Sequence, residues 1–355
     1  MPDLQIDASK PVMVTGATGY VAGWLIRRLV EEGLTVHATV RDPGDEAKRA
    51  HLDAMAAAAP GTIRYFKADL LDADAFDAPL QGCSTAFHTA SPFVTTVDDP
   101  QRDLVDPAVK GTRHVLQAAN RCEGLQRVVL TSSCAAIYGD NADVAETRAR
   151  CLTEDVWNTS SSLDHQPYSY SKTQAERAAW EIAGGQDRWR LVVVNPSLVV
   201  GPSTNDKPTS ESFDLMKTIA GGAMKSGAPH WEIGAVDVRD VAEAHLRAAF
   251  VPEAEGRHVT SAENTSFIGI AEHLRAERGP DPRLPSKTLP KWLVWLTGPM
   301  INPTLTRKVV ARNVGRPFCA DASKSKAALG LTYRPLGPGL AEMRDQLVAA
   351  GRIKA

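Results

Sequence analysis

The stretch Pro11–Val30, PVMVTGATGYVAGWLIRRLV, decides how this chain folds. A short apolar run, Val12–Val14, leads into a turn that has glycine at Gly16 and Gly19. After the turn, apolar residues recur at the spacing of one helix face, at Val21, Leu25, Ile26 and Leu29. Glycine permits a tight turn and a close approach of backbone to ligand, and the start of a helix offers unpaired N–H groups to an anion. A strand, a glycine turn and a helix in this order predict a site for the pyrophosphate of a dinucleotide.

The glycine spacing departs from the full pattern at one position. A third glycine would fall at position 22, where the chain has Ala22 followed by Gly23. Alanine is the usual replacement at this point, where the helix packs closely on the strand. The dinucleotide interpretation is therefore kept over that of an ordinary turn.

Arg41 and Asp42 follow a second predicted strand, Thr35–Val40, and they bear on which dinucleotide is bound. The end of this strand faces the adenosine ribose, where a carboxylate suits NAD and an arginine suits the 2′-phosphate of NADP. Because Arg41 directly follows the apolar strand, the sequence favours NADP(H), with Lys48 as a second candidate phosphate contact. A shift of one residue would put Asp42 on the ribose and favour NAD, and a solvated strand end is the plainer alternative.

Strands and helices alternate through the first part of the chain. Apolar runs predict strands at 12–14, 35–40, 63–68, 85–89, 127–130 and 190–194, and helical patterns lie between them. This alternation predicts the α/β class and a Rossmann-type doubly wound parallel sheet. We expect a dinucleotide-binding domain over residues 1–200, to which 236–250 returns with Asp240 as a helix N-cap. Residues 201–355 are expected to form a smaller, mixed substrate-binding region, in which Pro290–Leu296 is a core or lid helix too short to span a bilayer.

Tyr168 and Lys172 open a helical stretch, YSYSKTQAERAAW, and lie one turn apart on the same face. An ammonium beside a phenol stabilises the phenolate, so we expect Lys172 to lower the pKa of Tyr168. A phenol of this kind can give a proton to a carbonyl oxygen that is being reduced. Tyr170 is only two residues from Lys172 and faces away. By itself this spacing is common, and a surface pair is the alternative.

Composition excludes several classes of function. The formal net charge of −2 in 355 residues gives no sign of a nucleic acid or an anionic membrane as partner. The five cysteines are scattered and odd in number, which predicts free thiols, and the nine histidines show no metal-ligand spacing. The N-terminal MPDLQIDASK lacks the apolar core of a signal peptide, so we expect a cytoplasmic protein that binds no metal.

The segments, taken together, resemble a known family. The sequence is similar to the extended short-chain dehydrogenases/reductases, in the group of dihydroflavonol, cinnamoyl-CoA and microbial aldehyde or ketone reductases. The similarity is carried in order by VTGATGYVAGWLI, ATVRDP, KADLLD, FHTASPF, VVLTSS, YSYSKTQAERAAW, NPSLVVGP and VDVRDVAEAH, and at the C-terminal end by DASKSKAALGLTYRPL. These segments reach from residue 14 to 245 and then resume at 321.

The resemblance implies a Ser-Tyr-Lys active site at Ser133, Tyr168 and Lys172, with Ser132 as the fallback serine. Tyr168 would donate the proton, Ser133 would hydrogen-bond the substrate oxygen, and Lys172 would hold the ribose of the nicotinamide. Besides Tyr168 and Lys172, it implies the cofactor-binding residues Thr15, Gly16, Gly19, Tyr20, Val21, Arg41, Lys48, Asp69, Leu70, Thr89, Ala90, Ser91, Pro196, Ser197, Leu198 and Val199.

Two positions depart from the plant members of the family. Tyr138 stands where the flavonoid reductases have an asparagine, and His165-Gln166-Pro167 stands where cinnamoyl-CoA reductases have an asparagine-tryptophan pair. An aldehyde or ketone remains as the small-molecule substrate. The residues considered for its pocket are Phe93, Tyr138, Phe213, Met216 and Trp231, each of which also suits ordinary packing.

The sequence therefore predicts NADPH-dependent reduction of a carbonyl group. An epimerase of nucleotide sugars or a hydroxysteroid-type dehydrogenase on the same scaffold is one alternative, and a non-catalytic NADP(H) sensor is another. The resemblance also leaves a homodimer open.

Overall fold

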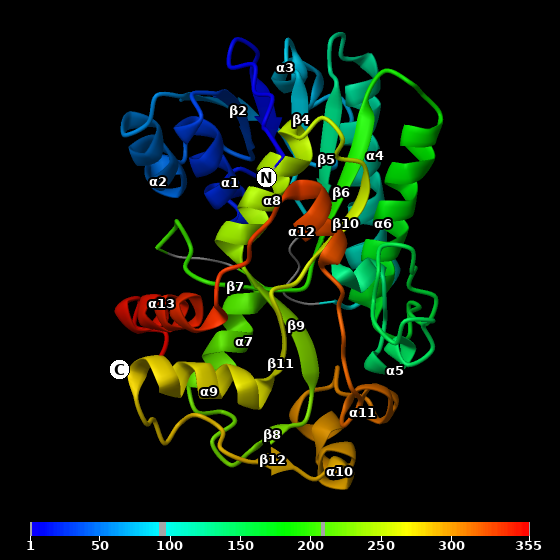
Figure 1. Ribbon diagram of the computed structural model, residues 1–355, viewed down its shortest axis with the longest axis vertical. Helices are drawn as coiled ribbons and strands as arrows, with labels where there is room; N and C mark the ends of the chain where they lie inside the picture. Colours follow the sequence, from blue (N-terminus) through cyan, green and yellow to red (C-terminus); the bar gives the residue numbers. More distant parts are fainter. Residues whose placement is uncertain (1, 92–96, 207–209, 355) are drawn as a thin grey trace.

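The computed structural model describes residues 2–91, 97–206 and 210–354. In these ranges a parallel sheet has the strand order β10-β6-β5-β4-β1-β2-β3 (Figure 1). Its strands are β1 (Val12–Val14), β2 (Thr35–Val40), β3 (Thr62–Lys67), β4 (Thr85–His88), β5 (Arg127–Thr131), β6 (Arg190–Pro196) and β10 (Gly256–Thr260). The predicted doubly wound α/β sheet is thus confirmed, with β10 joining it from the later part of the chain.

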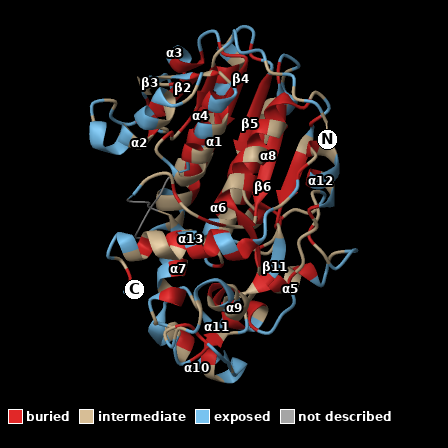
Figure 2. Ribbon diagram, turned by 60° about the vertical axis from the view of Figure 1, so that its left-hand side comes forward, coloured by how far each residue is buried: buried red, intermediate tan, exposed pale blue. Residues whose placement is uncertain are grey.

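Successive residues of these strands face opposite sides, and both sides are covered. Met13 lies in a core with α3 (Asp77–Leu80), α4 (Asp106–Arg121) and α6 (Pro167–Gly184), whereas its neighbours Val12 and Val14 lie in a second core with α1 (Tyr20–Glu31), α2 (Glu46–Ala57) and α8 (Val238–Phe250). Burial on both faces explains why the strands read as continuous apolar runs. Figure 2 shows this buried layer running through the sheet.

A second, mixed sheet lies beyond the carboxyl end of β6. It pairs β7 (Leu198–Val200), β9 (Glu232–Asp237) and β11 (Glu263–Ser266), and β8 (Ala228–Pro229) pairs with β12 (Thr288–Leu289) nearby. The helices of this part are α7 (Glu211–Ala220), α9 (Phe267–Arg278), α10 (Lys291–Ile301), α11 (Arg307–Asn313) and α13 (Leu336–Ala349). Two further helices, α5 (Asn141–Val144) and α12 (Ser323–Leu329), are short.

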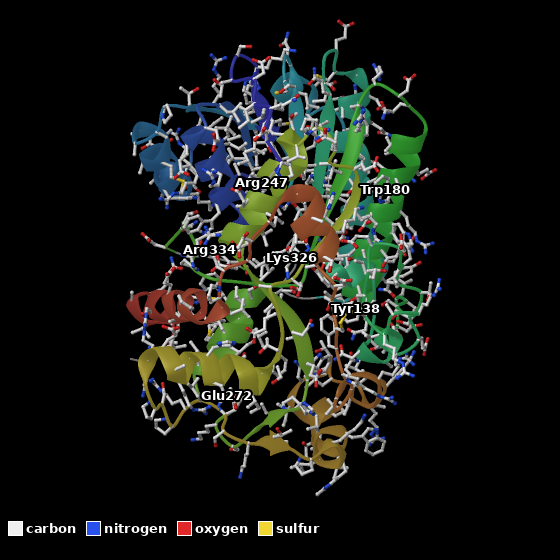
Figure 3. All side chains as sticks on the ribbon, in the orientation of Figure 1. Tyr138, Trp180, Arg247, Glu272, Lys326 and Arg334 are labelled. Atoms are coloured by element: carbon white, nitrogen blue, oxygen red, sulfur yellow. A yellow bond between two sulfur atoms is a disulfide. The ribbon has the colours of Figure 1, made fainter. Side chains whose placement is uncertain are left out.

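Three expectations from the sequence are corrected here. Asp237, not Asp240, caps α8, because β9 runs on to residue 237 and its carboxylate accepts the Arg239 N–H at 2.8 Å. Asp240 is instead buried in the first turn and accepts the backbone N–H of Arg334 at 2.7 Å, beside the start of α8 in Figure 3. The short apolar stretch at 290–296 is part of α10, and its largest side chains face solvent instead of the core.

Two of the five cysteines are not free thiols. Cys151 and Cys319 form a disulfide, with their Cα atoms 4.6 Å apart, so the prediction of five free thiols is wrong for these two. Backbone bonds place them together, since the Leu152 N–H donates to the Cys319 carbonyl and the Asp321 N–H donates to the Leu152 carbonyl, each at 2.9 Å. The two cysteines are 168 residues apart, and spacing in the sequence carries no trace of this contact. Among the described residues, no helix is long and apolar enough to cross a membrane.

Candidate active site

The glycine turn between β1 and α1 forms a closely packed cradle. Gly16 has φ +64°, and a Cβ on it would lie 2.9 Å from the Cβ of Ala90. The Ala17 N–H donates to the Thr39 carbonyl at 3.0 Å, which ties the turn to the end of β2. Gly19 precedes α1 without a side-chain cap, and the first turn of α1 has no acidic residue. The first N–H groups of α1 are therefore available to an anion.

A buried hydrogen-bond network holds the end of β4 against this turn. The Thr15 hydroxyl accepts from the N–H groups of Thr89 and Ala90 at 3.1 and 3.0 Å. The same hydroxyl then donates its hydrogen bond to Nδ1 of His88, 2.9 Å away. Because Nδ1 accepts, the ring proton of the neutral His88 is on Nε2. Burial lowers the pKa of His88 to about 3, so the ring is neutral. One wall of the crevice is thus formed by Thr15, Thr89 and Ala90, three of the residues predicted to bind the cofactor.

The residues predicted at the adenosine ribose lie at the end of β2. Arg41 follows the strand and has an exposed side chain. Asp42 accepts the N–H of Gly44 at 2.9 Å and so stabilises the next turn. Lys48 is on α2, where its ammonium pairs with Asp45 at 2.6 Å. The Asp42 carboxylate is thus occupied by a hydrogen bond within its own turn, whereas the Arg41 side chain is exposed at the end of the strand.

Ser133, two residues beyond the end of β5, comes together with Tyr168 and Lys172 of α6. The Ser133 hydroxyl oxygen accepts the Ala135 N–H at 3.1 Å, which leaves its proton for the hydrogen bond to the Tyr168 phenol. The Lys172 ammonium lies 5.7 Å from the centre of the Tyr168 ring and donates to the Ser91 hydroxyl at 2.9 Å. Pro167 occupies the first turn of α6, where a fixed φ favours the start of a helix. Tyr168 as a whole residue is 40% exposed.

The electrostatics of this trio differ from the expectation in one respect. The pKa of Tyr168 is raised, first by burial of the phenol and then by the Glu211 carboxylate, while the hydrogen bond from Ser133 opposes the shift. The net shift is therefore opposite to the lowering expected from Lys172, because burial of the phenol has the largest effect on this pKa. Burial lowers the pKa of Lys172 to about 8, and Glu211 opposes that shift. A raised pKa keeps Tyr168 protonated, as a proton donor requires.

Glu176 anchors α6 one turn beyond Lys172. Its side chain is fully buried and lies 2.6 Å from Arg257, whose guanidinium stacks 4.1 Å from the centre of the Trp157 ring. The carboxylate also accepts from Ser132 at 2.5 Å and from the Asn195 amide at 2.8 Å. The fallback serine, Ser132, is thus engaged by Glu176, whereas Ser133 faces Tyr168.

A small cavity of about 20 Å³ lies below Lys172, between β4, β5, α4 and α6. Its walls include Ser91, His88, Thr112, Ser132 and Glu176. This volume fits one water molecule, and the polar lining offers that water enough partners.

The remaining predicted cofactor residues are spread around the same crevice. Tyr20 begins α1, but its hydroxyl donates to the Gly201 carbonyl at 2.6 Å and so ties α1 to the second sheet. Val21 follows it in the same helix. Leu70 lines the cavity, while Asp69 accepts the Leu71 N–H at 2.9 Å. Pro196, Ser197, Leu198 and Val199 form the crossing from β6 to β7.

The residues considered for the substrate pocket lie mostly in packed clusters. Phe213 and Met216 are on the buried face of α7, and Trp231 stacks on Phe267 with the ring centres 6.3 Å apart. The Tyr138 ring, labelled in Figure 3, packs 5.2 Å from that of Phe318. Phe93 lies outside the described residues.

Comparisons with known proteins agree with this architecture. The family of NAD dependent epimerases/dehydratases matches residues 12–260. The chain belongs to this family. Its members are extended short-chain dehydrogenases/reductases, as the sequence segments indicated.

Named relatives are oxidoreductases. Cinnamoyl-CoA reductase CAD2 of Medicago truncatula is 39% identical over 343 residues, which cover 95% of each chain. Tetraketide alpha-pyrone reductase 1 of Arabidopsis thaliana is 36% identical over 80% of this chain and 84% of its own. The structure of yeast methylglyoxal/isovaleraldehyde reductase Gre2 complexed with NADPH matches with a TM-score of 0.76 at 26% identity, over 97% of this chain and 100% of that one.

Sequence reasoning missed two charged groups of this site. Glu176 could have been found, because it follows Lys172 at the spacing of one helix turn. Glu211 stands far along the chain from Tyr168 and Lys172, and no local pattern connects them. Among the described residues, no group of three or more His, Cys, Asp or Glu side chains is placed to hold a metal ion.

Proposed function

We propose that this chain is an NADPH-dependent carbonyl reductase that converts an aldehyde or ketone to an alcohol. The observation that carries the proposal is the convergence of Ser133, Tyr168 and Lys172 beside the crevice of the glycine turn. The reductase names among the relatives support the same class of reaction.

The chain's residues fit a dinucleotide. The cradle at Gly16 has no room for a Cβ, and the uncapped start of α1 suits the pyrophosphate. Arg41 would pair with a 2′-phosphate, which favours NADP(H) because Asp42 is engaged with Gly44. The bound cofactor supplies a hydride to the carbonyl carbon.

The side chains supply the proton and the orientation. Tyr168 transfers its phenolic proton to the substrate oxygen as the carbonyl carbon accepts the hydride, so the product is a neutral alcohol. Ser133 donates its hydroxyl proton to the same oxygen as a hydrogen bond and holds it beside Tyr168. The charged Lys172 stabilises the phenolate that remains.

The test is spectrophotometric. Purified protein is mixed with NADPH or NADH and a panel of an aliphatic aldehyde, a dicarbonyl, an aromatic ketone and an aromatic CoA thioester. We expect oxidation of NADPH with at least one of the aldehydes or ketones and much slower use of NADH, whereas turnover of the CoA thioester alone would contradict the proposed substrate class. Tight NADPH binding without turnover of any member would favour a sensor and contradict the proposal.

A further inference from the structure

Helix α10 exposes its largest apolar side chains to solvent, unlike a core helix. Trp292, Trp295, Leu296 and Met300 recur at the spacing of one helix face and are 67%, 41%, 51% and 86% exposed. The opposite side carries Val294 and Gly298, which are buried. The small residues therefore pack inward, and the large ones form an outward stripe.

The inward contacts show that this orientation is built into the fold. Val294 packs with Val310 and Val314 of the α11 region, in one buried cluster. The Arg307 guanidinium lies 4.6 Å from the centre of the Trp295 ring and braces it from the side. A helix held in this way presents its stripe as a fixed surface.

The chain segment that carries the stripe has formal charges of a single sign. Residues 282–320 contain seven lysines and arginines and no aspartate or glutamate, although the whole chain has a formal net charge of −2. Arg312 is paired with Asp140 and Asp143. The side chains of Lys287, Lys291, Arg307, Lys308 and Arg316, which lie in the same segment, are exposed.

We propose that α10 and its flanking cations form a docking surface for an anionic lipid bilayer. Exposed tryptophans with aliphatic neighbours insert at the boundary of headgroups and acyl chains, and surrounding lysines and arginines attract anionic headgroups. The helix has 11 residues, about 16 Å at 1.5 Å per residue, which suits lying in the interface and not spanning it.

A second copy of the chain fits this surface less well. In a twofold contact the same patch meets itself, so its cations would face each other. An anionic partner relieves that repulsion.

The position of α10 leaves the active site accessible. Figure 1 shows α10, α11 and β12 at one end of the molecule, and the parallel sheet lies toward the other. Figure 2 shows the exposed turns of α10 at that end. Docking there leaves the crevice beside α1 and α6 uncovered. This proposal departs from the expectation of no membrane partner, which rested on the net charge of the whole chain and not on that of the segment 282–320.

The test uses the full chain and flotation with vesicles of phosphatidylcholine, with or without phosphatidylglycerol. We expect binding to the mixed vesicles that weakens with salt, and little binding to the neutral ones. The variant Trp292→Ser/Trp295→Ser should lower the partition by about tenfold or more. The variant Arg307→Gln/Lys308→Gln should lower it by about fivefold per cation. The matched control is Leu71→Ser, which removes a 57% exposed apolar side chain from the loop between β3 and α3 and should leave the partition unchanged.

Folding of each variant is checked by circular dichroism and by binding of NADPH. Absence of wild-type binding to the mixed vesicles overturns the proposal. So does binding that the tryptophan variant leaves unchanged. Dimerisation in analytical ultracentrifugation that this variant abolishes, without vesicle binding, would show that the stripe is a contact between copies and would also overturn it.

Discussion

Replacing Arg257 by methionine tests the buried network that supports α6. The substitution leaves the Glu176 carboxylate fully buried without the guanidinium 2.6 Å away, although Ser132 and Asn195 still donate to it. Breaking a buried ion pair by removing one partner costs about 3–5 kcal/mol, because the remaining charge stays desolvated. Two retained hydrogen bonds place the expected loss of unfolding free energy near the lower end, about 3 kcal/mol.

The assay is urea denaturation followed by circular dichroism. The matched control is Glu181→Gln, which breaks a pair of the same 2.6 Å length between α6 and Arg113, but with both side chains well exposed. That exposed pair should contribute about 1 kcal/mol or less to the free energy of unfolding. A loss for Arg257→Met no larger than that of the control would refute the account of Glu176 as an anchor.

Three further outcomes follow from the site. Arg41→Ala should weaken NADPH by about 1.5–3 kcal/mol and leave NADH almost unchanged, measured by fluorescence titration; an equal loss for both would place Arg41 away from the 2′-phosphate. Activity should fall as pH rises through about 8, because Lys172 loses its proton there. Since the Glu211 carboxylate raises that pKa, Glu211→Gln should move the fall to lower pH, and an unchanged pH–rate profile would contradict this. Gly16→Ala should destabilise the fold by at least about 1–2 kcal/mol, since φ is +64° and the added Cβ meets Ala90; normal stability and NADPH binding would count against the cradle.

The parallel sheet could be predicted because its strands are buried on both faces and its helices alternate with them. Val12–Val14 and Thr35–Val40 needed only local pattern, and the observed bounds agree. The Tyr168 and Lys172 pair followed from helix geometry alone. These features depend on residues close together in the sequence.

The features that sequence reasoning missed depend on contacts between distant segments. The disulfide of Cys151 and Cys319 forms because two loops meet. The net pKa shift of Tyr168 reflects burial and Glu211, neither of which a local pattern reports. The outward stripe of α10 could not be told from a core helix, because the same apolar residues suit both.

The most direct test of the central claim is the turnover of Tyr168→Phe with NADPH and the best carbonyl substrate found for the wild type. The variant loses only the phenolic oxygen, so NADPH should bind with unchanged affinity in a fluorescence titration. The rate of NADPH oxidation should fall by about 10²–10⁴-fold, the usual contribution of a positioned proton donor. A variant that binds NADPH and still reduces the substrate at the wild-type rate would show that Tyr168 is not the proton donor.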